Sequence, residues 1–170
     1  MPTLNELVVS TRFAGRYSNP LDLDTPSVLI DLVIPTLGRG YLNGSGAQQA
    51  SKYVTDRRTL ATATETIDLA GGTDPKDAFG NNLSFLNIRE ILIANRATTS
   101  GFNLTVDGTF WPAVIPGFAM ATDDIIIGPK GVLHFASPVD GYVVTPGTGD
   151  TIRLDSGVNT LDYDIIIVGI

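Results

Sequence analysis

The side chains that could carry out a reaction are few in this chain. Its one histidine, His134, lies inside the apolar run 131–135 (GVLHF). A catalytic histidine needs a nucleophile or an orienting acid within reach. Ser137 and Asp140 follow closely in sequence, but the geometry of a strand would spread them apart. One imidazole also rarely makes a zinc site. We therefore interpret His134 as a structural or surface residue.

Aspartates are more frequent, and some lie close together. Asp22 with Asp24, and Asp162 with Asp164, are spaced to share one face of a strand, and Asp74 and Asp77 belong to a Gly-rich loop. Calcium takes several oxygen ligands from such loops. However, neither the spacing of a helix-loop-helix calcium site nor a calcium-binding nonapeptide repeat is present. We interpret these residues as turn formers and solvated strand positions, and we predict no metal or cofactor, although the sequence leaves calcium in the Asp-rich loops open.

Enzymatic activity is not predicted. A glycosidase needs two facing carboxyl groups, one of them with a raised pKa. The sequence does not exclude such a pair, but Glu6, Glu65 and Glu90 are the only glutamates. The glycine-rich segment 38–46 (GRGYLNGSG) does not lead from a strand into a helix, so it does not predict a phosphate-binding loop.

Composition narrows the possible partners. The formal net charge is -7, and Arg57-Arg58 is the one adjacent basic pair, which argues against a nucleic-acid-binding surface. The chain has no cysteine, so disulfides and thiolate chemistry are excluded. We find no signal-peptide pattern and no apolar run near the roughly 20 residues needed to span a bilayer. We expect a soluble protein that is made in a cytoplasm.

The last third of the chain consists of short apolar runs, each closed by a turn signal. They are residues 124–128 (DIIIG), 131–135 (GVLHF), 141–145 (GYVVT), 150–154 (DTIRL) and 161–170 (LDYDIIIVGI). This spacing, without a helical pattern between the runs, predicts an all-β fold, an antiparallel sandwich or barrel. With the runs upstream, about eight or nine strands follow Ala61, the usual number for a β-sandwich of jelly-roll type.

Further elements are expected upstream. Residues 59–69 (TLATATETIDL) alternate with period two and predict one strand. Residues 83–94 and 102–106 predict a hairpin, Asp107-Gly108 predicts a hairpin turn, and residues 110–115 (FWPAVI) predict an edge strand. Residues 47–53 (AQQASKY) predict one or two helical turns.

The first part of the chain differs from the rest. We divide the chain into an N-terminal arm and loop, residues 1–45, and a β-sandwich domain, residues 46–170. In the arm, residues 4–9 predict a short strand or helical turn, and residues 27–34 (SVLIDLVI) predict a strand bracketed by prolines. The arm could lie on a neighbouring subunit, or its strand could belong to the same sheet.

Aromatic residues are the remaining candidates for contacts. Phe13 and Tyr17, with Arg16 between them, lie on the arm and are our predicted partner contacts. Trp111 is the single tryptophan. It could be a core residue, the ordinary case in a sandwich, or an interface anchor, and we include it among the predicted contacts.

A series of motifs in fixed order resembles a family of small virion structural proteins of tailed bacteriophages, of the capsid decoration or cement type. The motifs are GAQQA (46–50), DRRTL (56–60), ETIDLAG (65–71), DAFGNNLSF (77–85), PKGVL (129–133), GYVVTPGTGD (141–150) and YDIIIVG (163–169). The resemblance covers roughly residues 10–170. The insertion Asp74-Pro75-Lys76 departs from the family pattern and leaves only the role of that loop in doubt.

The resemblance implies a function and partners. The protein would bind the outer surface of the capsid, contact the major capsid protein, and stabilise the head as a homo-oligomer, a trimer or dimer. It would be located on the virion. The resemblance implies no catalytic residues. The alternative is a component of the tail, neck or head fibre with a receptor-binding or glycan-binding role.

Overall fold

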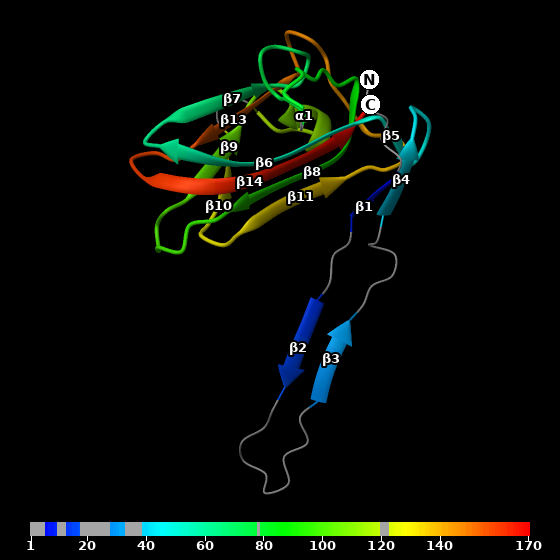
Figure 1. Cartoon of the computed structure of the whole chain (residues 1–170). Coiled ribbons are helices and arrows are strands. Elements are labelled where there is room, and N and C mark those ends of the chain that lie inside the picture. The colour runs from blue at the N-terminus through cyan, green and yellow to red at the C-terminus, as the bar shows by residue number, and fades with distance from the viewer. Residues whose placement is uncertain (1–5, 10–12, 18–27, 33–38, 78, 120–122) are drawn as a thin grey trace, which may run out of the picture.

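The computed structural model describes residues 6–9, 13–17, 28–32, 39–77, 79–119 and 123–170. Within them, nearly all regular structure is β (Figure 1). The elements are β1 (Glu6–Val9), β2 (Phe13–Tyr17), β3 (Val28–Leu32), β4 (Arg39–Asn43), β5 (Gln49–Ala50), β6 (Lys52–Ala61), β7 (Thr64–Asp68), β8 (Asn87–Asn95), β9 (Leu104–Asp107), α1 (Trp111–Val114), β10 (Ile125–Ile127), β11 (Val132–Ala136), β12 (Tyr142–Val143), β13 (Thr151–Asp155) and β14 (Thr160–Gly169). None of the described helices has the length and apolar character needed to cross a membrane.

Two antiparallel sheets form a sandwich, which confirms the predicted all-β class. The five-stranded sheet has the order β11-β8-β14-β6, with β12 also paired to β8, and the four-stranded sheet has the order β10-β9-β13-β7. Eight strands of the described residues, β7 to β14, follow Ala61, which agrees with the eight or nine expected there.

The strand pairs of the sandwich are nested in sequence. β6 pairs with β14, β7 with β13, β8 with β11, and β9 with β10. The chain therefore folds back on itself around the link between β9 and β10. This nested order favours the jelly-roll interpretation, in which a long antiparallel ribbon wraps into two sheets.

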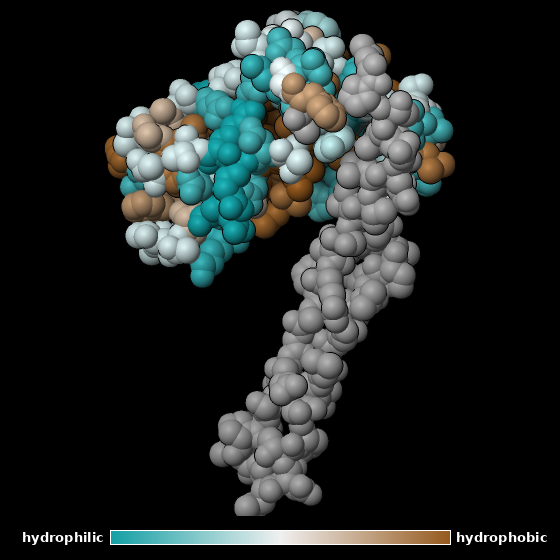
Figure 2. Space-filling view, viewed as in Figure 1, coloured by the Kyte–Doolittle hydropathy of each residue, from teal (hydrophilic) through white to brown (hydrophobic). Residues whose placement is uncertain are grey.

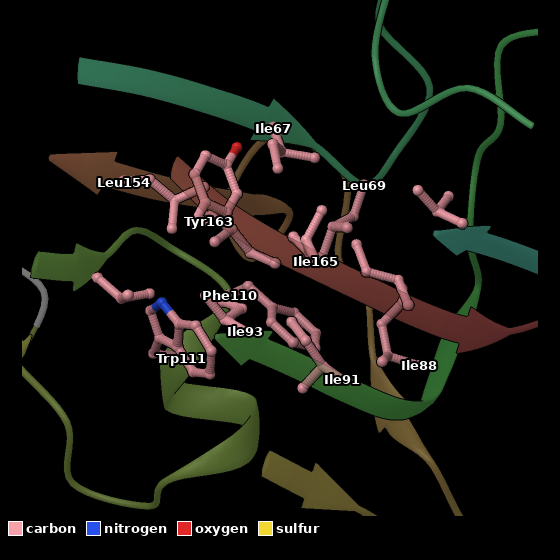
Figure 3. Close-up of a cluster of buried hydrophobic side chains, with 14 of the residues drawn as sticks. Ile67, Leu69, Ile88, Ile91, Ile93, Phe110, Trp111, Leu154, Tyr163 and Ile165 are labelled. Atoms are coloured by element: carbon pink, nitrogen blue, oxygen red, sulfur yellow. The ribbon is translucent and has the colours of Figure 1, made fainter. Parts of the chain in front are cut away.

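The core lies between the two sheets (Figure 3). In β14, Leu161, Tyr163, Ile165 and Ile167 are buried and alternate with more exposed residues, as period-two patterning requires. Ile67 and Leu154 contribute from the four-stranded sheet to the same cluster. Burying each such side chain stabilises the fold by roughly 1.5–3 kcal/mol.

Two predicted elements are wrong in type. Residues 110–115 do not form an edge strand, because α1 occupies Trp111–Val114, and Pro112 fits the first turn of a helix, where its missing N–H is not needed. Residues 47–53 do not form a helix. There β5 pairs with β4 and β6 pairs with β14, so strand pairing overrides a weak helix propensity.

One predicted strand is interrupted, and one predicted hairpin does not form. The alternating segment 59–69 is not one strand, because β6 ends at Ala61 and β7 begins at Thr64, with Thr62 at a φ of 51° between them. The segments 83–94 and 102–106 do not form a hairpin. β8 and β9 belong to different sheets, and β9 pairs with β10 and β13 instead.

The N-terminal part forms two small sheets. β1, β4 and β5 make a three-stranded sheet, and β2 and β3 form an antiparallel hairpin. In Figure 1 this hairpin extends away from the sandwich, beyond β1 and β4. The predicted boundary between residues 45 and 46 falls inside the three-stranded sheet, because Leu42 of β4 pairs with Gln49 of β5.

Candidate interaction surface

Three of the predicted contact residues lie in one strand of the hairpin. Phe13, Arg16 and Tyr17 are all in β2, where they pair with Leu32, Leu29 and Val28 of β3. The backbone therefore brings these three positions together in the part of the chain that extends away from the sandwich (Figure 1).

The hairpin register places both charged positions, Arg16 and Asp31, on the same face. Directly paired residues and residues two apart share a face of a sheet. One face therefore carries the positions of Phe13, Gly15, Tyr17, Val28, Ile30 and Leu32. The other face carries the positions of Ala14, Arg16, Leu29 and Asp31. Arg16 thus lies on the opposite face from Phe13 and Tyr17.

Trp111 is not a surface contact, which corrects its inclusion among the predicted contacts. Its side chain is 0% exposed, and the indole Nε1 donates a 2.7 Å hydrogen bond to the carbonyl oxygen of Asp107. The rings of Phe110 and Phe135 lie at centroid distances of 6.0 and 6.2 Å. A tryptophan so enclosed acts through core packing, the alternative left open by the sequence.

A buried carboxylate joins the three-stranded sheet to the sandwich. Glu90 of β8 is 1% exposed. It accepts a 2.8 Å hydrogen bond from the hydroxyl of Tyr41 in β4, and its other oxygen lies 2.6 Å from Nε2 of His134 in β11. His134 therefore contacts a buried carboxylate, Glu90, that has a structural role. The contact fixes β4, the last strand of the N-terminal arm, against the outer side of the five-stranded sheet.

Arg89 adds a second tether at the same place. The pairing of β8 with β14 has a bulge here, because Val168 pairs with Glu90 and Gly169 with Ile88. The Arg89 guanidinium donates to the carbonyl oxygens of Val139 and Gly46 at 2.5 and 3.2 Å. A bulge redirects one side chain of a strand, and here that side chain connects two loops to the sandwich.

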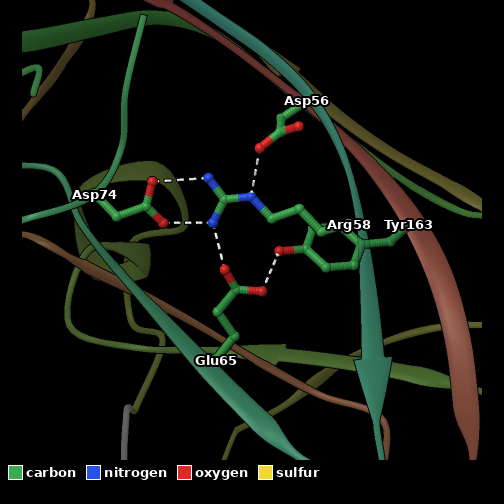
Figure 4. Close-up of polar contacts among 5 residues, drawn as sticks. All are labelled: Asp56, Arg58, Glu65, Asp74 and Tyr163. Carbon is green, nitrogen blue, oxygen red and sulfur yellow. Dashed lines mark hydrogen bonds and ion pairs between the residues drawn. The ribbon is translucent and has the colours of Figure 1, made fainter. Parts of the chain in front are cut away.

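On the side where β6 and β7 are the edge strands, Arg58 bridges the two sheets (Figure 4). Its guanidinium contacts both oxygens of Asp74, one oxygen of Glu65 in β7, and Asp56. The hydrogen bonds to Asp74 contribute most to raising the pKa of Arg58. Burial, followed by the hydrogen bond to Glu65, raises the pKa of the Tyr163 phenol. This network closes the sandwich edge with charged groups, which disfavours strand addition there.

The outer face of the five-stranded sheet combines charged and apolar rows. Asp164 in β14 pairs with Arg57 at 2.6 Å and with Arg96 at 3.5 Å, and the Arg57 contact holds the pKa of Asp164 below its usual value. The next row toward the three-stranded sheet carries Ile166 and Leu92. Figure 2 shows a hydrophilic band on this side of the sandwich with apolar surface beside it.

A short loop presents an exposed aromatic ring. Phe79 is 74% exposed. The Asp77 carboxylate accepts hydrogen bonds from the backbone N–H groups of Phe79 and Asn81 at 2.8 and 2.9 Å, and from the Asn81 amide at 2.9 Å. The loop begins close to Asp74, which Arg58 holds. The ring of Phe79 therefore extends from a loop that its own hydrogen bonds constrain.

The sequence predicted that the arm contacts lie in one segment. It did not predict the polar contacts that connect the three-stranded sheet and the nearby loops to the sandwich. Glu90 and Arg89 are consecutive residues in an apolar run, and no local pattern shows that one binds Tyr41 and the other the carbonyls of distant loops. The pair Asp22 and Asp24 lies outside the described residues. Among the described residues, no group of three or more His, Cys, Asp or Glu could hold a metal ion.

Comparison with known proteins yields no relative: neither a protein-family model nor a curated protein matches this sequence.

Proposed function

We propose that this protein is a structural component of a tailed-bacteriophage virion that binds the outer capsid surface as a homo-oligomer and stabilises the head. The observation that supports it best is the β2–β3 hairpin, which extends from a sandwich that has its own core (Figure 1). A body that folds on its own, with an arm that contacts neighbours, suits a protein that bridges subunits of a shell. Many weak contacts of this kind, linked through one oligomer, add up to strong attachment.

The acidic net charge of -7 agrees with this proposal. A protein on the outside of a capsid must remain soluble before assembly and has no need to bind packaged DNA, which a basic surface would promote. The major capsid protein is the proposed partner, and Phe13, Arg16 and Tyr17 are the proposed contact positions on the arm.

Immunogold electron microscopy of purified virions, with an antibody against this chain, tests the location. Label distributed over the heads is the expected result. Label confined to the tail or neck would contradict capsid decoration. Absence of label on intact virions and on opened, detergent-treated virions alike would contradict a virion protein altogether.

Arm excision tests the role of the hairpin. Val9 and Arg39 are paired across β1 and β4, so a two-residue Asn-Gly turn can replace residues 10–38 without disturbing either strand. We expect the excised protein to fold and to bind heads that lack the wild-type protein at least tenfold more weakly. Unchanged binding would show that the arm is not the attachment element.

One observation favours a second function, receptor or glycan binding from the tail, neck or a head fibre. Exposed aromatic rings next to Asp and Asn are common on sugar-binding faces, and Phe79 lies beside Asp77 and Asn81 with the exposed Asn82 close by. A glycan array with the wild-type protein and with Phe79→Ala tests it. Val158→Ala is the matched control, because Val158 is 88% exposed on a different turn. Binding lost only in Phe79→Ala would support this function.

A further inference from the structure

β11 is an edge strand of the five-stranded sheet, and it pairs on one side only (Figure 1). On that side the backbone N–H of Asn95 donates to the carbonyl oxygen of Gly131 at 3.0 Å, and the N–H of Ser137 donates to that of Arg89 at 2.8 Å. In an antiparallel pair, every second residue exchanges hydrogen bonds with the neighbouring strand. These two bonds therefore fix which residues of β11 face β8 and which face away.

The residues between those two bonds alternate accordingly. Leu133 and Phe135 direct their N–H and C=O groups to β8, and Val132, His134 and Ala136 direct theirs outward. Within the part of the chain that the structure describes, no group hydrogen-bonds to these six outward atoms. Such an unpaired row is a template for one further strand.

The β11 edge also lacks the features that usually protect an edge. β11 contains no charged residue and no proline, and Val132 is 59% exposed. Charged side chains and prolines are the common means of preventing strand addition. The opposite edge of the sandwich, at β6 and β7, has them in the contacts of Arg58 with three carboxylates. The two edges of the sandwich therefore differ in what they admit.

We propose that β11 of one molecule pairs in antiparallel orientation with β11 of a second copy, about a two-fold axis at His134. In one register alone, all three outward residues of each copy lie opposite outward residues: His134 opposite His134, and Val132 opposite Ala136. All six outward groups of each edge are then bonded, and the two five-stranded sheets become continuous. The inference deepens the self-association that is part of the proposed function and rests on that part alone, since it requires neither the arm nor a capsid.

The side chains of β11 complement themselves in this register. The exposed Val132 meets the small side chain of Ala136, so the outer face closes without a collision. On the inner face, Leu133 lies opposite Phe135, and both are partly exposed side chains that pack against the core. Aromatic and aliphatic side chains opposite each other stabilise a strand pair. Each His134 keeps its 2.6 Å contact with Glu90 of its own chain.

The other edges of the sandwich are poorer counterparts for β11, which favours a symmetric pair. β6 and β7 carry charges along their length. β10 has three residues, and the carbonyl oxygen of Ile127 already accepts a 2.9 Å hydrogen bond from the Asn95 amide. Pairing of β11 with a different edge would also leave one edge free on every molecule and build filaments, whereas two β11 strands form a closed dimer.

Amide hydrogen exchange, read residue by residue by NMR, tests the geometry. At concentrations where sedimentation velocity shows a dimer, the amides of Val132, His134 and Ala136 should exchange at least tenfold more slowly than in dilute monomer. The amides of Leu133 and Phe135 should be protected at both concentrations, because they bond to β8. A dimer formed through any other surface would not produce this alternation.

A pair of variants at the first residue of β11 tests the backbone contact. Proline is tolerated at the start of an edge strand whose N–H faces away from the sheet. Val132→Pro should raise the dimer dissociation constant at least tenfold, because it removes an outward N–H from each copy. Val132→Thr keeps the N–H and the branched side chain and should change the constant less than threefold. Trp111 fluorescence checks that each variant is folded.

Introduced cysteines test the register in the intact strand. The chain has no cysteine of its own. Residues opposite each other in a hydrogen-bonded pair have Cα atoms about 5.5 Å apart, within the range of a disulfide. The double variant Val132→Cys/Ala136→Cys should therefore oxidise to a covalent dimer. Val132→Cys alone should not, because the two Val132 positions are offset by roughly 14 Å along the strands.

Four results would overturn the inference: a monomer at all concentrations, equal effects of the two Val132 variants, a dimer that is lost when residues 10–38 are removed, or outward amides protected only when heads are added. The last would assign the edge to a strand of another protein. Failure of the proposed function differs from these. A dimer with the alternating protection together with label on tails would contradict capsid decoration alone, and labelled heads with a monomeric protein would contradict this inference alone.

Discussion

Arg58 illustrates how one side chain can hold two sheets together at their open edge. Its side chain is 15% exposed and contacts three carboxylates. Removing it would leave Asp56, Glu65 and Asp74 close together without a counter-charge. We expect Arg58→Ala to lower the free energy of unfolding by about 2–4 kcal/mol, measured by urea unfolding at pH 7. Arg57→Ala is the matched control, because the adjacent Arg57 is 62% exposed, and it should have a small fraction of that effect. Equal effects would show that Arg58 is not a structural bridge.

The loop that presents Phe79 should respond to acid. Hydrogen bonds from Asn81, Phe79 and Gly80 hold the pKa of Asp77 below its usual value. These bonds therefore stabilise the loop fully above the unfolded pKa, near 3.9, and are lost as pH falls through the lower folded pKa. Amide chemical shifts of Phe79 and Asn81 should titrate with a midpoint below about 3.9. In Asp77→Asn that titration should disappear. A midpoint at or above the usual value would contradict this account.

Trp111 offers a spectroscopic test of its own position. Because the indole is 0% exposed and its N–H is satisfied, emission should be blue-shifted and poorly quenched by acrylamide in the folded protein. Unfolding should shift it to the red. Binding to a second copy or to heads should leave the emission unchanged. A change in the emission spectrum on self-association would show that Trp111 lies at the interface between copies.

At the scale of elements, Gly108 shows why a turn signal in the sequence led to a wrong connection. Asp107-Gly108 has the composition of a hairpin turn, but the chain there passes close to β13 before entering α1. A Cβ at Gly108 would lie 2.3 Å from the carbonyl oxygen of Thr151, and φ is 119°. Glycine is required here for close approach of two backbones.

A pair of glycine variants separates close approach from backbone conformation. Gly108→Ala should lower the free energy of unfolding by roughly 2–4 kcal/mol, because it adds a backbone collision to a strained φ. Gly157→Ala, at a φ of 60° with no atom within 4 Å of its Cβ, should lower it by about 1 kcal/mol. Thermal or urea unfolding measures both. Similar losses would mean that β13 can move away from residue 108.

Short apolar runs closed by turn signals located the strands in the last third of the chain. β14 alternates clearly, and the runs that became β10, β11 and β13 were located within a few residues. An apolar or alternating pattern does not show at which residue a strand ends. Thr62 lies in an alternating Thr-rich segment, yet the turn forms there because its N–H bonds the carbonyl of Asn159 in another turn. Partner choice failed for the same reason: whether β9 pairs with β8 or β13 depends on residues far away in sequence.

The candidate interaction surface was partly predictable from the sequence. Aromatic residues on a segment without its own core marked the arm, and Phe13 and Tyr17 do share a face of β2. The apolar character of the whole face appears only once the register with β3 is known, because a shift of one residue would exchange the two faces. The polar contacts of Glu90 and Arg58 join residues 49 and 16 positions apart, and no local signal encodes them.

At the scale of the whole molecule, the hairpin and the sandwich should be energetically separable. β2 and β3 pair with each other, and the sandwich core contains no described residue before Val54. We expect replacement of residues 10–38 by Asn-Gly to change the free energy of unfolding of the monomer by no more than about 0.5 kcal/mol, measured by urea unfolding with Trp111 fluorescence. A larger loss would show that the arm supports the sandwich.

The strand that completes the five-stranded sheet, β14, is the last described strand to be synthesised. β14 lies between β6 and β8, so the five-stranded sheet has a gap at its centre until residues 160–169 are in place. Its pairing with β6 joins residues about a hundred positions apart, which makes sheet closure a slow, late event. During synthesis, the edges of β6 and β8 that later pair with β14 therefore remain unpaired until residues 160–169 have left the ribosome. Such a nascent chain is exposed to aggregation, and chaperones that shield strand edges should raise its yield.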